Sequence, residues 1–98
     1  MRYEIEQTKA FADWLDGLRD PTAREIISRR IVRIASGNLG SVEPVGGGVS
    51  EVKVDFGPGY RLYFIIRGLS LILLLCGGDK SSQSRDVRRA HAMAEKLR

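Results

Sequence analysis

The chain has 98 residues, of which 43% are hydrophobic and three are proline, so an intrinsically disordered protein is excluded and one compact domain over residues 1–98 is expected. The formal net charge is +4, and a single cysteine excludes an internal disulfide. The N-terminal residues are charged, unlike a secretory leader, and the longest apolar run, Leu69–Cys76, is too short to span a bilayer. We therefore expect a cytoplasmic protein without a membrane partner.

The first part of the chain predicts a strand followed by two helices. Tyr3–Gln7 alternates between apolar and acidic side chains, which is typical of a half-buried strand. Thr8 can cap a helix whose apolar positions recur at three- and four-residue spacing, namely Phe11, Trp14, Leu15 and Leu18. Asp20 and Pro21 then form an N-cap and first position for a second helix that ends near Gly37. This second helix turns its isoleucines to one face and four arginines to the other, Arg24, Arg29, Arg30 and Arg33.

The second part predicts a glycine-rich connection over Leu39–Val49 and then a β-hairpin. Ser50–Phe56 alternates cleanly, and a Gly-Pro-Gly turn separates it from a strand over Tyr60–Arg67. Across a three-residue turn, Phe56 would pair with Tyr60 and Asp55 would oppose Arg61.

The last part predicts a third strand of this group and a final helix. Leu71–Cys76 is apolar on both faces, so we expect it in the middle of the sheet. A Gly-Gly-Asp stretch at residues 77–79 then leads into a helix rich in arginine.

The predicted order is β-α-α-β-β-β-α, an α+β fold. We expect a small, antiparallel-rich sheet with the N-terminal helical hairpin packed on one face and the other face partly open. By period-two alternation, Arg61, Tyr63 and Arg67 share that open face, and Lys53 joins them from the neighbouring strand.

Familiar catalytic and nucleotide-binding motifs are lacking. The GPGYRL stretch lacks the third glycine of a dinucleotide fingerprint and enters a strand, and GGDKS at residues 77–81 lacks the first glycine of a phosphate loop. One histidine and one cysteine cannot build a metal site of the usual kinds, so no metal or cofactor is expected. Cys76 lies in the most apolar strand and His91 beside apolar helix positions, so we interpret the first as an inert thiol and the second as a packing residue.

A cluster of cations remains. Lys53, Arg61 and Arg67 share a sheet face, and Lys80 and Arg85 come from the start of the last helix, whose backbone N–H groups would add donors for an anion. The cluster fits an anion-binding site. It fits a solvated, salt-bridged sheet face equally well.

Two long segments, SEVKVDFGPGYRLYFIIRG and LLLCGGDKSSQSRDVRRAHAMA, stand out together with the opening segment IEQTKAFADWLDGLRDPTAREIISRRIVRIASGNLG. These segments resemble the RelE/ParE superfamily of toxins from bacterial toxin–antitoxin pairs, and within it the HigB-like group of addiction module killer proteins. The resemblance implies a RelE-like fold and a metal-independent endoribonuclease that cuts mRNA on the ribosome. It also implies contacts with 16S rRNA and neutralisation by a cognate helix-turn-helix antitoxin.

The resemblance also implies roles for individual residues. Arg61 would stabilise the reacting phosphate, and Lys53 and Lys80 would complete the catalytic set. Arg67 and Arg85 would hold flanking phosphates, with a base stacked on one of two tyrosines, Tyr60 or Tyr63.

The chain departs from the family pattern after its last strand. Several members carry a histidine or tyrosine there, whereas this chain has Gly-Gly-Asp-Lys at residues 77–80. The acid and base therefore stay open, with Glu43, Glu51 and Asp79 as possible carboxylates. Because relatives with this fold poison DNA gyrase without cleaving anything, a ParE-like gyrase inhibitor is the alternative function. A relative whose only partner is its antitoxin is the third.

Overall fold

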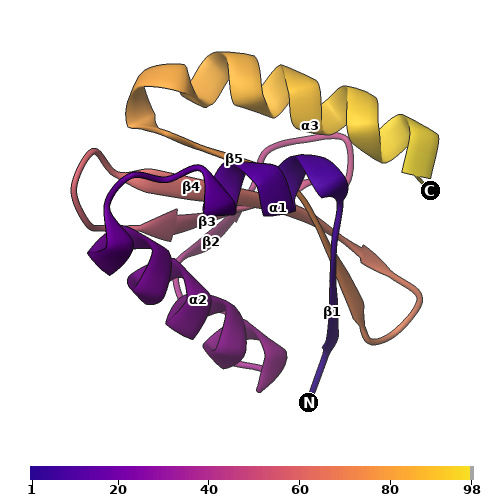
Figure 1. Ribbon diagram of the computed structural model, residues 1–98. Helices are drawn as coiled ribbons and strands as arrows, with labels where there is room; N and C mark the ends of the chain where they lie inside the picture. The colour runs from indigo at the N-terminus through magenta and orange to yellow at the C-terminus, as the bar shows by residue number, and fades with distance from the viewer. Residues whose placement is uncertain (98) are drawn as a thin grey trace.

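The computed structural model describes residues 1–97 and shows a mixed sheet with helices on both faces (Figure 1). The elements are β1 (Glu4–Gln7), α1 (Lys9–Asp16), α2 (Pro21–Ala35), β2 (Val42–Pro44), β3 (Ser50–Val54), β4 (Tyr60–Arg67), β5 (Leu71–Asp79), a short 3₁₀ helix η1 (Lys80–Ser82) and α3 (Gln83–Leu97). The five strands lie in the order β1-β5-β4-β3-β2. β1 pairs parallel with β5, and the other neighbours are antiparallel.

The predicted α+β class, the N-terminal helical hairpin and the interior position of β5 are confirmed. Both predicted helix caps are present, since the Thr8 side chain accepts from the Phe11 N–H and the Asp20 side chain from the Thr22 N–H. The edge strand β2 lies within the stretch that we expected to be a connection. It is only three residues long, which is too short for an alternation pattern to reveal it.

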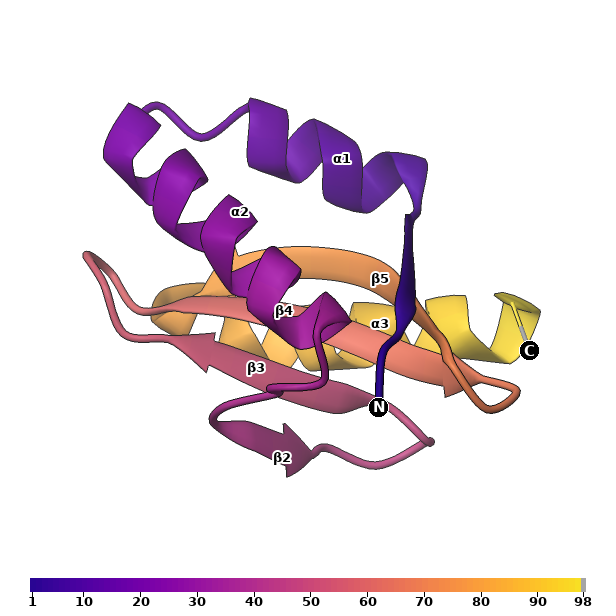
Figure 2. The same cartoon turned by 90° about the horizontal axis from the view of Figure 1, so that it is seen from below.

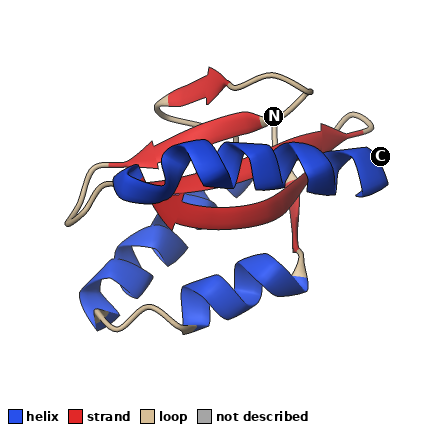
Figure 3. Ribbon diagram, turned by 90° about the horizontal axis from the view of Figure 1, so that it is seen from above, coloured by secondary structure: helices blue, strands red, loops and turns tan. Residues whose placement is uncertain are grey.

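Each face of the sheet has its own apolar core. On one face, α1 and α2 bury side chains such as Phe11 and Ile27 against the sheet. On the other face, α3 lays Ala90 and Ala94 over β4 and β5. Figures 2 and 3, seen from opposite sides, show α2 in front of the sheet in one view and α3 in front in the other. The expectation of a partly open second face is therefore wrong there, and Tyr63 on that face is 0% exposed.

The β3–β4 hairpin has a different register from the predicted one. Val54, not Phe56, pairs with Tyr60, and Lys53 lies opposite Arg61. The loop spans residues 55–59 because the chain turns before Phe56, whose N–H donates to the Val54 carbonyl at 2.9 Å. The slip is two residues, so every side chain keeps its face.

β5 continues past Cys76, where we expected it to end, through both glycines to Asp79. A Cβ added at Gly77 would overlap the Trp14 ring, and one added at Gly78 would overlap the Asp86 carboxylate. The two glycines therefore let α1 and α3 approach the strand from opposite sides. Along residues 1–97, no helix is long and apolar enough to cross a membrane.

Candidate active site

Three basic residues meet at the end of the sheet where β4 begins. Lys53 lies directly opposite Arg61 in the β3–β4 pair, and Arg61 lies opposite Gly78 in the β4–β5 pair. Lys80 follows two residues after Gly78. A Cβ at Gly59 would lie 3.5 Å from Arg61 Nη1 and 3.6 Å from Lys80 Cβ, so both residues border the same turn. The structure thus brings together the three residues predicted as catalytic.

Arg61 is fixed at the centre of this cluster. Its side chain is only 12% exposed, and its Nε lies 3.8 Å from Glu51 Oε1. Its Nη1 donates to the carbonyls of Gly59 at 3.3 Å and Tyr60 at 3.4 Å. A guanidinium held in this way needs little reordering to receive an anion.

Glu51 pairs with Arg61 and is itself only 1% exposed. Its Oε2 accepts from Gln83 Nε2 at 2.9 Å, which joins the start of α3 to β3. Desolvation, followed by the negative charge of Glu51, raises the pKa of Tyr63, so this phenol stays neutral. The sequence placed Glu51 on the polar side of β3 but did not indicate that α3 would bury it.

The two lysines are more accessible than Arg61. The Lys53 side chain is 40% exposed, and its Nζ lies 3.5 Å from Glu43 Oε1. Lys80 is exposed at the first position of η1. Both cations can therefore reach a ligand that lies over Arg61.

The helix start beside Lys80 is less available to an anion than expected. The Asp79 carboxylate accepts from the Ser81 N–H at 2.8 Å and from the Ser81 hydroxyl at 2.5 Å. These hydrogen bonds, the side-chain one first, hold the pKa of Asp79 below its ordinary value. Because this carboxylate caps η1, the backbone donors predicted for an anion are partly occupied.

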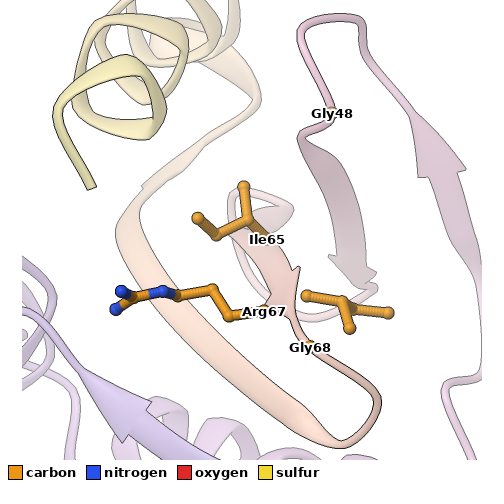
Figure 4. Close-up of a pocket in the computed structure, with 5 residues that line it drawn as sticks. Gly48, Ile65, Arg67 and Gly68 are labelled. Atoms are coloured by element: carbon orange, nitrogen blue, oxygen red, sulfur yellow. The ribbon is translucent and has the colours of Figure 1, made fainter. Parts of the chain in front are cut away.

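Arg67 lies apart from the cluster, at the opposite end of β4. It pairs with Leu71, six residues from Arg61, which corresponds to about 20 Å along a strand. Figure 4 shows Arg67 beside Ile65 and the Gly68 turn, where a pocket of about 390 Å³ opens. Alternation along the strand assigned Arg61 and Arg67 to one face, but it did not indicate how far each of them lies from Lys80.

The expected stacking role of Tyr60 and Tyr63 does not fit the structure. Tyr63 is 0% exposed beneath α3. Tyr60 is 8% exposed and points to the other face, where its ring centroid lies 6.2 Å from that of Trp14 in an edge-on arrangement. Neither ring is free to receive a base.

Arg85 lines a separate cleft of about 430 Å³ on the far side of β5 from Arg61. Trp14, Gly77 and Arg89 also line it, together with the carboxylates of Asp79 and Asp86. Arg85 remains a candidate for a phosphate that flanks the cluster. The sequence did not indicate that Arg89 lines this cleft, because no local pattern shows that it lies near Trp14.

Cys76 and His91 are packing residues. Burial raises the pKa of the Cys76 thiol to about 11, and this side chain is 1% exposed. His91 Nε2 lies 2.9 Å from the Val45 carbonyl oxygen, and its ring packs against Gly46 and Gly47. Among residues 1–97, no three histidine, cysteine, aspartate or glutamate side chains are grouped so that they could hold a metal ion.

No protein-family model matches the chain. A Haemophilus influenzae protein described as uncharacterized is 39% identical over 97 residues, which cover 99% of this chain and 98% of the relative. The chain belongs to the family of that protein. Among solved structures, a double-arginine mutant of E. coli toxin RelE in the free state superimposes with a TM-score of 0.73 over 99% of this chain and 98% of RelE, at 18% sequence identity. The fold is therefore RelE-like.

On this RelE-like fold, the cluster can do one kind of chemistry well. A fixed guanidinium beside two more accessible ammonium groups can stabilise negative charge that develops on a phosphate. The buried Glu51 holds the guanidinium in place without reaching solvent.

Proposed function

We propose that this protein is the toxin of a type II toxin–antitoxin module and a metal-independent endoribonuclease that cuts mRNA on the ribosome. Within the RelE-like fold, we place it in the HigB-like group of addiction module killer proteins. The observation that carries the proposal is the position of Arg61, fixed by Glu51 and flanked by Lys53 and Lys80.

Strand cleavage by the ribose itself needs a base, an acid and stabilisation of negative charge, and we assign all three to the cluster. The 2′-hydroxyl attacks the adjacent phosphorus, its proton passes to a base, and the bond from phosphorus to the 5′ oxygen breaks as that oxygen takes up a proton. A 2′,3′-cyclic phosphate and a 5′-hydroxyl result. Arg61 stabilises the extra charge on the phosphate oxygens, and Lys53 and Lys80 supply further positive charge and proton transfer at the two ends of the reaction.

The partners follow from the same proposal. The substrate is mRNA on the ribosome, with contacts to 16S rRNA, and a cognate helix-turn-helix antitoxin blocks the cytoplasmic toxin. Arg85 and Arg67 hold flanking phosphates at a distance from the cut, since Arg85 lines a separate cleft and Arg67 lies at the other end of β4.

A ParE-like gyrase inhibitor is the second candidate. Among residues 1–97, no histidine or solvent-accessible tyrosine lies beside Arg61, since His91 packs against Val45 and both tyrosines of β4 are buried. A non-enzymatic toxin would need no such group.

The test is to express the chain alone in a bacterial host and to map new 5′ ends on cellular mRNA. Cuts confined to translated frames are expected for the wild type and for Arg88→Ala, which removes an exposed arginine on α3. They should disappear in Arg61→Ala while antitoxin binding persists. Growth arrest with intact mRNA and DNA-damage signalling would overturn the nuclease in favour of gyrase inhibition.

A further inference from the structure

A basic groove that the proposed catalytic cluster does not use lies where α2 packs against the end of β3. We refer to it as the α2 arginine groove. It has a volume of about 270 Å³ and is lined by Ile26, Arg29, Arg30, Arg33 and Val54. Its lining holds three cations and no carboxylate. Arg29 pairs with Glu25 at 3.7 Å, and both side chains are more than two-thirds exposed, so this pair offsets little of the charge.

Arg30 is built into the wall of this groove. Its Nη2 donates to the Leu39 carbonyl at 3.3 Å, and its guanidinium lies against Gly40, where any Cβ would overlap it. Its Nε is buried and has no hydrogen-bond partner among the described residues. Burial, followed by the charge of Arg33, lowers the pKa of Arg30. The fold thus holds one cation in a fixed place beside another, an arrangement that an anion would relieve.

The lining indicates which anion fits. Arginine forks match phosphate oxygens in pairs, and all three cations are arginines. None of the five lining residues is aromatic, so the groove lacks the rings on which single-strand-binding proteins stack successive bases. A base-paired RNA keeps its bases stacked inside the duplex and presents its phosphates, so it fits this lining better than a single strand.

The groove also faces away from the catalytic cluster. Val54 belongs to the core beneath α1 and α2, whereas the neighbouring Lys53 points to the opposite side of β3 and lies beside Arg61. Figure 2 shows α2 crossing the sheet on the side opposite α3. An RNA in the groove therefore occupies different space from a strand lying over Arg61.

We propose that the α2 arginine groove is a second RNA-binding surface, which takes the phosphate backbone of a base-paired RNA while a single strand lies at Arg61. The single strand at Arg61 rests on the proposed function, whereas the base-paired RNA in the groove is inferred from the groove alone.

Fluorescence anisotropy with two probes tests the proposal: an RNA hairpin with a long base-paired stem and an unstructured single-stranded RNA. The double variant Arg29→Ala/Arg33→Ala keeps Arg30, which packs against the fold, and Arg2→Ala/Arg88→Ala removes the same charge from exposed positions elsewhere. We expect the groove variant to bind the hairpin about tenfold more weakly, with the salt dependence reduced by about two phosphate contacts. Its affinity for the single strand should match that of the control variant.

Three results would overturn the proposal. One is hairpin binding that is equal in the two double variants. Another is an equal loss of affinity for the hairpin and for the single strand in the groove variant, which would mean that these arginines bind the substrate strand. The third is tighter, arginine-dependent binding of a polyglutamate peptide, which would point to an acidic protein partner. If the wild type instead fails to cut mRNA in cells, the proposed function fails, while the hairpin measurement still decides the role of the groove.

Discussion

The guanidinium of Arg61 lies 3.8 Å from the carboxylate of Glu51, a residue that is 1% exposed. A buried ion pair adds little net stability, because both charges lose their hydration when the chain folds. It does fix positions, and here Gln83 holds the other carboxylate oxygen at 2.9 Å. The pair therefore sets where the central cation of the proposed active site stands, and α3 takes part in setting it.

Replacing Glu51 by glutamine tests this dependence. Glutamine keeps the shape and can still accept from Gln83, but it removes the charge that faces Arg61. We expect the free energy of unfolding to fall by about 1–3 kcal/mol and mRNA cleavage to fall by about tenfold or more. Urea unfolding and 5′-end mapping measure the two effects.

The matched control is Asp13→Asn, which removes an exposed carboxylate 2.7 Å from Lys9, away from the cluster. Exposed ion pairs contribute little, so we expect a change within about 0.5 kcal/mol and nearly normal cleavage. Equal stability and activity in the two variants would show that Glu51 does not position Arg61.

The sequence predicted the elements because their signals are local. Thr8 and Asp20 are N-cap residues that indicate where the first two helices begin, and strand alternation assigns Lys53 and Arg61 to one face. The covering of that face by α3 was missed because the apolar side of α3, which includes Ala90 and Ala94, does not by itself indicate which face of the sheet it packs against. The burial of Glu51 followed from the same unpredicted contact.

The distances within the candidate site were also beyond local patterns. Alternation groups Arg61 with Arg67, yet their separation along β4 puts only the first beside Lys80. The register slip had a local cause as well, since a three-residue turn was assumed where the loop takes five residues, 55–59. Turn length depends on the backbone conformation of Gly57 and Gly59, both at positive φ, which composition alone does not specify.

The contact between Gly77 and Trp14 gives a second prediction. Gly77 has ordinary strand geometry, so alanine would fit its backbone, but the new methyl group would overlap the Trp14 ring. We expect Gly77→Ala to lower the free energy of unfolding by about 1–3 kcal/mol, as overpacking does. Urea unfolding at neutral pH measures the change.

A double-mutant cycle identifies the cause of that loss. In a Trp14→Leu background the side chain is smaller and can yield, so Gly77→Ala should cost less than it does in the wild type. Strictly additive effects would mean that the ring is not what excludes a side chain at position 77.

The third prediction concerns the buried thiol of Cys76, whose pKa is raised to about 11 by burial. In the unfolded chain a thiol ionises with a pKa near 8.5. Between these values the unfolded state loses its proton while the folded state keeps it. Stability is therefore unaffected below about pH 8.5 and falls as the pH rises towards 11, by up to about 3 kcal/mol.

Urea unfolding under reducing conditions at several pH values, for the wild type and for Cys76→Ala, isolates this contribution. The alanine variant loses volume in the core and should be less stable at neutral pH. Only the slope against pH is compared, so this loss does not affect the test. The Tyr63 phenol also has a raised pKa, but its ordinary value near 10 delays its contribution to higher pH, in both proteins alike. The wild type should therefore lose stability faster than the variant between about pH 8.5 and 10, and parallel curves would mean that burial does not hold the Cys76 proton.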